Sequence, residues 1–396
     1  MSNALLVLNA GSSSLKASLF RLESGKDNLP LHCRALAERL GGEGQLTLTA
    51  ADGTALRRLP LPTPSRHADA VALLMGWIEE LYPDLTIRAI GHRVVHGGDL
   101  YTGPTLLDEQ TLKTLRSFIP LAPLHQPHNL QAPEFLHDHA PGIPQVACFD
   151  TSFHRTMPAV AEQFALPRQW SAKGIKRYGF HGLSYEYIAE TLPDYVDLPP
   201  QSRVIVAHLG HGVSMAALKD LKSIATTMGF TALDGLPMGK RCGNIDPGVL
   251  LHLMMSEGLR VEEVNDILYK QSGLLGVSGL SDDVRDLLAS PSPHAAEAID
   301  LLVYRIVREI GALAACLEGL DAIVFTAGVG EHAAPIRHAV CEKLKWMGLD
   351  FDPVANKTHG PCLTTKESRI SAWVIPTNEE LMIARHSYQQ IKDTLS

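Results

Sequence analysis

Several short runs of Val, Ile, Leu, Ala and Phe constrain the fold most, because each run stops at glycine and polar residues. They lie at residues 4–10, 89–98, 145–152, 203–212 and 321–332. Runs that are apolar at successive positions suit strands buried on both faces of a sheet. Segments with apolar residues at helical spacing lie at 68–82, 247–257, 261–271, 296–318 and 379–394. Together the two patterns predict an α/β protein.

The length of 396 residues predicts two domains, because it exceeds the usual size of one hydrophobic core. A weak internal repeat points the same way. A strand that ends in small polar residues occurs in LNAGSSSLK (8–16) and again in AHLGHGVSMAAL (207–218), and a second β-type stretch follows each time. The repeat predicts two related halves, each with a hairpin that holds a phosphate.

Charge and composition exclude several classes of protein. The formal net charge is -8 and there is no long basic stretch, which argues against nucleic-acid binding. The six cysteines form no CxxC pair and no zinc-ligand spacing, so we expect reduced thiols. The N-terminus lacks the features of a signal peptide, and the apolar segment 296–320 carries Arg305, Arg308 and Glu309, which argues against a membrane span. We expect a cytoplasmic protein.

The segment Asn9–Lys16 is the first candidate anion site. Small residues at a strand end let backbone N–H groups approach an anion. Ser12 and its neighbours add hydroxyl donors, and Lys16 adds a charge on a flexible stem. The same residues also fit a polar hairpin turn. The segment is not a Walker A loop, since G-x-x-x-x-G-K-[ST] is absent from the chain.

Two further glycine turns are predicted at 210–214 and 328–333. The second of these fits G-x-G-x-x-[GA] after a strand, so a dinucleotide-binding fold has to be considered. However, it lies late in the chain, and a mixed segment rather than a clear βαβ unit is predicted to follow it. Three glycine turns at strand ends favour one nucleotide held between two lobes.

Arg93 and Arg241 lie in glycine-rich stretches with few other charges. Phosphoryl transfer spreads negative charge over three oxygens, and guanidinium groups match that geometry. Each arginine alone also fits a structural or surface role. His181 lies between Gly179 and Gly182, which is typical of a tight functional turn.

Asp150, at a strand end, and Glu379 are carboxylates suited to a hard cation such as Mg²⁺. Glu379 also fits a helix start, where acidic residues are favoured. His125 and His128 match no zinc pattern.

The chain resembles the acetate kinases, including the related propionate kinases, over nearly its whole length. The resemblance rests on motifs in the family's order: LVLNAGSSSLK, GHRVVHGG, FDTSFH, YGFHGLS, AHLGHG, TTMGFTALDGLPMGKRCGNIDPG, DDVRD, FTAGVGEH and IPTNEELMIAR. It implies a two-domain actin-like (RNase H-like) α/β fold with a duplicated core and an active-site cleft between the domains. The first domain would be 1–150, with the C-terminal helix 381–396 packed back on it, and 151–380 would form the nucleotide-binding domain. It also implies a homodimer.

The resemblance implies a role for each matching position. Asn9 and Glu379 match magnesium positions, Arg93 the substrate carboxylate clamp, and Asp150 the essential acidic residue. Arg241 and His181 match residues that stabilise the transferring phosphoryl group. The acyl pocket would be lined by Val95, Leu124, Phe180 and Ala232. ATP-binding positions would be Ser12, Lys16, His208, Leu209, Gly210, His211, Gly212, Asp283, Val284, Arg285, Gly328, Val329, Gly330, Glu331 and His332.

The activity implied is Mg²⁺-dependent, reversible, in-line transfer from ATP to acetate, giving acetyl phosphate and ADP, with Mn²⁺ as a second suitable metal. An acetate-like acid has a pKa near that of Glu, about 4.3, and is already ionised at neutral pH. Asp150 is therefore expected to orient Mg²⁺ waters or arginines rather than remove a proton. Alternatives are a propionate kinase, a pyrophosphate-dependent variant, a sugar or glycerol kinase, and an actin-like ATPase; a dehydrogenase rests only on the third glycine turn.

The chain departs from the family pattern at several positions. His211 and His332 stand where Asn is usual, Lys240 where Thr is usual, Cys242 where Ser is usual and Asn244 where Asp is usual. Lys240 adds a positive charge and Asn244 removes a negative one, which predicts a more cationic phosphate site. Ala232 stands where many members have Pro, and its small side chain leaves room for a further methylene. One methylene in an apolar pocket is worth about 1–3 kcal/mol, so we expect propionate to compete with acetate.

Overall fold

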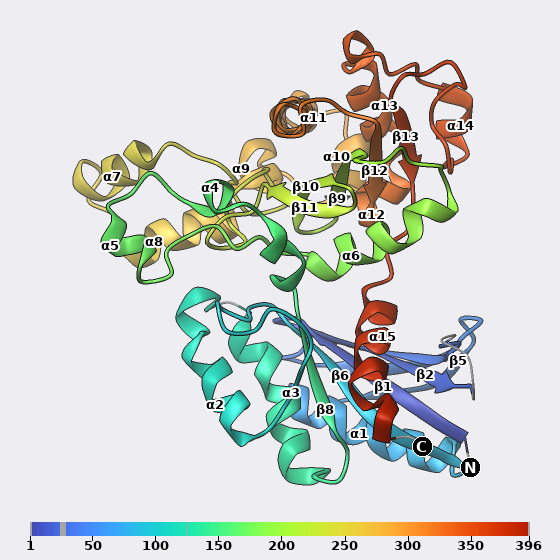
Figure 1. Ribbon diagram of the computed structural model, residues 1–396. Coiled ribbons are helices and arrows are strands. Elements are labelled where there is room, and N and C mark those ends of the chain that lie inside the picture. Colours follow the sequence, from blue (N-terminus) through green and yellow to red (C-terminus); the bar gives the residue numbers. More distant parts are fainter. Residues whose placement is uncertain (1, 24–28, 124, 395–396) are drawn as a thin grey trace. The chain divides into compact units, whose positions relative to one another are not determined.

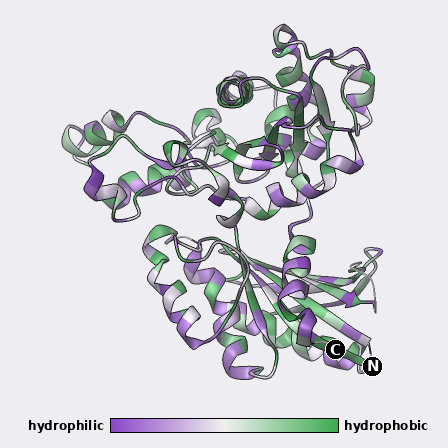
Figure 2. Cartoon of the chain, in the orientation of Figure 1, coloured by the Kyte–Doolittle hydropathy of each residue, from purple (hydrophilic) through white to green (hydrophobic). Residues whose placement is uncertain are grey.

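The computed structural model describes residues 2–23, 29–123 and 125–394. The chain forms two compact units, Met1–Ser152 with Asn378–Ser396, and Phe153–Thr377 (Figure 1). Each unit is built on one sheet, whose central strands are largely hydrophobic (Figure 2). Within the described ranges, no helix is long and apolar enough to cross a membrane.

The first unit contains an eight-stranded sheet in the order β5-β4-β3-β2-β1-β6-β8-β7. β1 (Ser2–Ala10) pairs antiparallel with β2 (Ser14–Leu22) and parallel with β6 (Leu85–Val94), which pairs parallel with β8 (Gln145–Phe149). The outer strands are β3 (Leu31–Glu38), β4 (Gln45–Ala50), β5 (Ala55–Pro60) and β7 (Thr105–Leu106). Residues 4–8 of β1 are almost completely buried, which explains their apolar run.

Helices cover both faces of this sheet. α1 (His67–Leu81) and α3 (Gln126–His139) share one core with Leu6, Leu8 and Ile90. α15 (Glu379–Ile391) lies on the other face, where Gly91 of β6 faces it. A Cβ on Gly91 would lie 2.3 Å from Ser387 Oγ, so glycine is needed for this close packing. α2 (Glu109–Ser117) packs on α3.

The second unit repeats the same core. Its sheet has the order β11-β10-β9-β12-β13, with β9 antiparallel to β10 and parallel to β12. This matches β3-β2-β1-β6-β8 in order and direction, which confirms the predicted duplication. The strands are β9 (Arg203–Leu209), β10 (Val213–Lys219), β11 (Lys222–Thr226), β12 (Ala322–Thr326) and β13 (Ser371–Val374).

α6 (Gly182–Thr191) covers one face of the second sheet, where Tyr185 and Ile188 share a core with Val206 and Val324. The long helix α11 (Pro293–Cys316) also contacts the sheet, at β9, β10 and β11. The shorter helices are α4 (Ala159–Glu162), α5 (Arg168–Ser171), α7 (Pro247–Met255), α8 (Val261–Asp266), α9 (Gly273–Ser278), α10 (Val284–Ala289), α12 (Ala327–His332), α13 (Ala334–Glu342) and α14 (Pro353–Lys357).

Three local predictions were wrong. The glycine turn predicted at 328–333 lies largely in a short helix, α12, which begins directly after β12. The segment after it completes a parallel crossover, since β12 and β13 are parallel neighbours joined through α12, α13 and α14. The helix predicted over 261–271 ends at Asp266 and continues as a π-helical stretch, Ile267–Gln271.

Candidate active site

The hairpin of β1 and β2 places Asn9 directly opposite Lys16. Residues in such a pair have their side chains on the same face of the sheet. The turn between the strands is closed by Gly11 N–H, which donates to the Ser14 carbonyl at 2.8 Å. Ser12 and Lys16 are exposed. The hairpin therefore brings the predicted metal residue Asn9 and the predicted phosphate residue Lys16 together.

Arg93 is the centre of a polar cluster in the first unit. It lies near the end of β6, beside β8, after which Asp150 follows. Arg93 Nε donates to Asp150 Oδ1 at 2.9 Å and Nη2 donates to Oδ2 at 2.5 Å. Arg93 Nη1 donates to Asn9 Oδ1 at 3.3 Å, and Glu379 Oε2 lies 3.8 Å from Nε. Four predicted residues are thus brought to one place by β1, β6, β8 and α15.

This cluster holds more negative than positive charge. Burial raises the pKa of Glu379 above its usual range; Arg93 opposes the rise, and Asp150 and Glu380 add to it. Burial alone would lower the pKa of Arg93, but the carboxylates of Asp150 and Glu379 raise it above its usual value. A cation bound here would relieve the repulsion among the carboxylates.

Oxygen donors of this kind suit Mg²⁺, which takes one or two carboxylates and completes its shell with phosphate oxygens and waters. Asn9 and Glu379 supply such donors. Over the described residues, no group of three or more His, Cys, Asp or Glu side chains has the arrangement of a metal site made by protein alone. The two oxygen donors of Asn9 and Glu379 fit a metal whose remaining ligands are phosphate oxygens and waters.

The pairing with Asp150 leaves one edge of the Arg93 guanidinium for an anion. Asp150 uses Nε–H and the neighbouring Nη2–H. Asn9 Oδ1 accepts one N–H of Nη1, so the terminal nitrogens Nη1 and Nη2 each keep one further N–H that can pair with a carboxylate. Asp150 itself is 1% exposed, with both oxygens facing the guanidinium. This geometry suits an orienting role for Asp150.

His181 begins α6 in the second unit with a left-handed backbone, φ 56°, a conformation that is costly for a non-glycine residue. Its Nδ1 lies 2.8 Å from Ser214 Oγ, and its ring stacks on His208 with centroids 4.2 Å apart. A Cβ on Gly212 would lie 3.1 Å from His181 Nε2 and 3.9 Å from Arg241 Nη1. The glycine therefore lets His181 and Arg241 approach the same point.

The predicted acyl-pocket residues are divided between the units. Val95, in the first unit, is buried, and its N–H donates to Asn129 Oδ1 at 2.9 Å. Phe180 is buried beside His181, and the Ala232 carbonyl accepts a hydrogen bond from Arg241 Nη1 at 2.9 Å. Leu124 lies outside the described residues.

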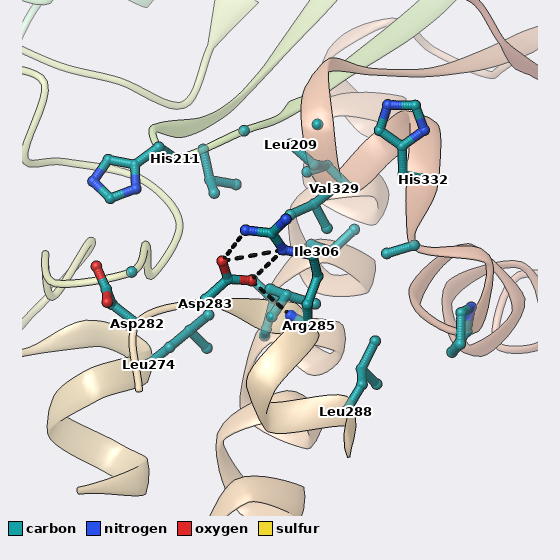
Figure 3. Close-up of a pocket in the computed structure, with 18 residues that line it drawn as sticks. Leu209, His211, Leu274, Asp282, Asp283, Arg285, Leu288, Ile306, Val329 and His332 are labelled. Atoms are coloured by element: carbon teal, nitrogen blue, oxygen red, sulfur yellow. Dashed lines mark hydrogen bonds and ion pairs between the residues drawn. The ribbon is translucent and has the colours of Figure 1, made fainter. Parts of the chain in front are cut away.

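A cavity of about 660 Å³ lies in the second unit (Figure 3). Much of its lining is apolar and includes Val213, Leu274 and Ile306, which suits a flat heterocycle such as adenine. Charged and imidazole side chains also line it (Figure 3). Hydrogen bonds from the side chain and backbone of Arg285 lower the pKa of Asp283 to about 2. The predicted residues that line it are Leu209, Gly210, His211, Asp283, Val284, Arg285, Gly328, Val329 and His332.

Of the predicted nucleotide residues in the second unit, four do not line this cavity. His208 lies under His181 and is held by Ser184 Oγ at 2.8 Å. Gly212 faces His181 and Arg241, as described above. Gly330 packs against the β12 backbone, and the Glu331 carboxylate accepts the Thr377 N–H at 3.2 Å.

Sequence patterns missed part of the lining. Leu302 and Ile306 are four residues apart on α11, a spacing that predicts core packing as readily as a ligand site. Asp282 also lines the cavity, and its Oδ2 lies 3.5 Å from Lys240 Nζ. Asp282 therefore partly offsets the positive charge of Lys240.

Two α/β units with the same core, one with an arginine–carboxylate cluster and one with a heterocycle-sized cavity, define a nucleotide-dependent phosphotransferase. A model of the acetokinase family matches residues 4–385, and the chain belongs to this family. The acetate kinase of Rhodopseudomonas palustris (strain ATCC BAA-98 / CGA009) is 52% identical over 392 residues, covering 98% of both chains. These matches confirm the family that the motifs predicted, and with it an enzyme.

Solved structures of acetate and propionate kinases have the same fold as this chain. A propionate kinase from Francisella tularensis subsp. tularensis SCHU S4 superimposes with a TM-score of 0.90 at 36% identity, covering 98% of this chain and 99% of that one. An acetate kinase from Porphyromonas gingivalis gives a TM-score of 0.87, also at 36% identity and with the same coverage. The predicted two-domain fold class is confirmed.

Proposed function

We propose that the protein transfers the γ-phosphoryl group of ATP to acetate, giving acetyl phosphate and ADP, with Mg²⁺ as the metal. The observation that carries this proposal is the Arg93 cluster, in which Asp150 and Asn9 leave one further N–H on each terminal nitrogen of Arg93 for a carboxylate. The curated relatives named acetate kinase support the same substrate.

The first unit binds the acyl substrate in this proposal. The acetate carboxylate pairs with Arg93 Nη1 and Nη2. Acetate is already ionised at neutral pH, so the attacking oxygen needs no base. Asp150, whose two oxygens both accept from Arg93, holds the guanidinium in place.

The second unit binds the nucleotide. The base enters the 660 Å³ cavity, and the phosphates extend past Gly210, which lines it, toward Gly212, which faces His181 and Arg241. His181 Nε2 and the Arg241 guanidinium approach the same point. His181 donates to the phosphoryl oxygens, and Arg241, whose Nη1 is held by the Ala232 carbonyl, supplies positive charge where negative charge develops in the transition state.

Asn9 and Glu379 would hold the metal, and Mn²⁺ suits the same donors. When bound, Mg²⁺ supplies charge neutralisation at the phosphate oxygens. Lys16, opposite Asn9, adds a positive charge at the same hairpin. The carboxylate repulsion around Glu379 favours cation binding.

The proposal includes a homodimer in the cytoplasm. No residue of α7 is buried, although the helix is largely hydrophobic (Figure 2). Leu251 and Met255 of α7 are 55% and 81% exposed, and Val261 of α8 is 67% exposed. Exposed apolar patches mark association sites, and two-fold dimers are the commonest assembly. Sedimentation should show a dimer, and Met255→Glu should weaken it; a wild-type monomer at micromolar concentration would refute this part.

A hydroxamate assay tests the activity, because hydroxylamine traps acyl phosphates. The protein is incubated with MgATP and acetate, propionate or butyrate in parallel, with glycerol and glucose as acceptor controls in an ADP-release assay. Acyl hydroxamate from acetate supports the proposal. Product only with pyrophosphate as donor, or ADP release only with a sugar, would replace it with the corresponding alternative.

A further inference from the structure

A chain of three buried or half-buried polar groups, Tyr185, Ser214 and His181, is linked by hydrogen bonds in the second unit. Tyr185 Oη lies 2.5 Å from Ser214 Oγ, and Ser214 Oγ lies 2.8 Å from His181 Nδ1. Tyr185 and Ser214 are completely buried. Tyr185 is one helical turn after His181 on α6, and Ser214 is the second residue of β10. The chain therefore joins two elements at the phosphoryl end of the second unit.

The direction of the hydrogen bonds follows from burial. Burial raises the pKa of Tyr185 well above its usual value, so the phenol keeps its hydrogen. Within the described part of the chain, Ser214 Oγ is the hydrogen-bond partner of that phenol. A buried donor left unpaired is costly, so Tyr185 donates to Ser214. The Ser214 hydrogen then points to His181 Nδ1, which accepts it.

We propose that Tyr185 and Ser214 are positioning residues that hold His181 as a neutral imidazole with its hydrogen on Nε2. Nε2 is the atom that faces Gly212, beside Arg241 Nη1. The hydrogen is thus directed at the point where, on the proposed function, the transferring phosphoryl group lies. Arg241 supplies the positive charge there, and His181 supplies a neutral hydrogen-bond donor.

The surroundings of His181 disfavour a second positive charge. Arg241 lies near the same glycine, and His208 of β9 stacks on the His181 ring. His208 Nδ1 is 2.8 Å from Ser184 Oγ, and Tyr185 reaches His181 through Ser214. A protonated His181 would need Nδ1–H to donate to Ser214, whose oxygen already accepts from Tyr185. The Ser214 hydrogen would then lose its acceptor.

The tautomer is measured directly by NMR of the full chain labelled with ¹⁵N-histidine, at pH 7.5. The His181→Gln spectrum identifies the His181 signals by difference. We expect a wild-type signal for hydrogen on Nε2 alone. In Ser214→Ala and Tyr185→Phe we expect a mixture of tautomers. Hydrogen on Nδ1, or on both nitrogens, in the wild type would overturn the proposal.

Kinetics supply a second readout. Tyr185→Phe should lower kcat by about 10-fold at pH 8, as for other residues that orient a functional histidine, with KM for acetate and ATP within about 2-fold. Tyr187→Phe, two residues further along α6, is the matched control and should leave kcat unchanged. An unchanged kcat in Tyr185→Phe, or equal losses in both variants, counts against a positioning role.

The charge of His181 is tested by substitution. Gln places a neutral donor near the Nε2 position, whereas Lys places a cation there. The proposal expects His181→Gln to retain at least about 10-fold more kcat than His181→Lys; the reverse order contradicts it. A protein with the Nε2 tautomer but no acyl phosphate product would refute the proposed function and leave the tautomer assignment intact.

Discussion

Replacing Asp150 by Asn tests whether this carboxylate orients Arg93 or acts as a base. The side-chain oxygen of Asn can still accept from Arg93 Nε, but its NH2 group then faces Arg93 Nη2. Both groups are donors, so the second hydrogen bond is lost. A hydrogen bond to a charged group is worth about 1.5–3 kcal/mol. If this hydrogen bond no longer orients Arg93 toward acetate, kcat/KM should decrease by roughly 10- to 150-fold.

The orienting role predicts how that decrease is distributed. KM for acetate should rise, because Arg93 turns away from the substrate, and the pH dependence of kcat should keep its wild-type shape. A general base instead contributes about 10²–10⁴-fold and defines the acidic limb of the profile. Steady-state kinetics over a range of pH separate the two. Loss of the acidic limb with an unchanged KM would refute the orienting role.

Asp321→Asn is the matched control for this experiment. Asp321 also holds an arginine through two contacts, Arg203 Nε at 3.1 Å and Nη2 at 2.6 Å. Neither residue lies among the candidate site residues. Asp321→Asn should therefore change the free energy of unfolding but not KM for acetate. A similar rise of KM in both variants would show that the Asp150 effect is only structural.

Four further predictions concern the site and the fold. Arg241→Ala should lower kcat by roughly 10³-fold or more, by analogy with arginine fingers, while KM for acetate changes little; an effect confined to KM in steady-state assays contradicts this. Ala232→Pro should lower the propionate-to-acetate ratio of kcat/KM by about 10-fold, within the 1–3 kcal/mol that one methylene is worth; a wild-type ratio already hundreds of times in favour of acetate refutes the premise. Gly91→Ala places a Cβ 2.3 Å from Ser387 Oγ and should lower the free energy of unfolding, measured by urea denaturation, by about 1–3 kcal/mol. In the control Gly76→Ala, in α1, the new Cβ has no atom within 4 Å, so this substitution should be neutral or stabilising. Burial lowers the pKa of His92 and of His154 to about 4 from 6.5. Between these pH values the unfolded chain binds more protons than the folded chain, so the free energy of unfolding should fall as the pH decreases from 6.5 to 4, by up to about 3 kcal/mol per histidine. A urea midpoint that stays constant over this pH range would contradict the burial of neutral histidines.

Local patterns predicted the central strands because burial on both faces makes a strand apolar at every position. The run 4–10 became β1 (Ser2–Ala10), and 203–212 became β9 (Arg203–Leu209). The edge strands left no such signal: β5 (Ala55–Pro60) has no buried residue. A strand that is stabilised by hydrogen bonds to neighbouring strands, rather than by burial of its own apolar residues, cannot be predicted from a local hydrophobic pattern.

The site is built from residues that are far apart in the sequence, so no local sequence pattern could show that they meet. Arg93 is 57 residues from Asp150 and 84 from Asn9, yet hydrogen bonds join them. From the residues alone, the Asn9 segment also fitted a polar hairpin turn, and Arg93 also fitted a structural role. Family motifs named the residues, but Tyr185 behind His181 was missed, since a tyrosine on a buried helix face is typical of core packing.

The duplicated core explains why such different chemistry arises at equivalent places. In open α/β sheets, ligands bind at the carboxyl ends of the parallel strands. In the first unit, the ends of β1, β6 and β8 carry Asn9, Arg93 and Asp150. In the second unit, the ends of β9 and β12 carry His208 and Thr326. The fold therefore fixes where polar groups gather in each unit, and the side chains at those strand ends determine which kind of ligand each unit suits.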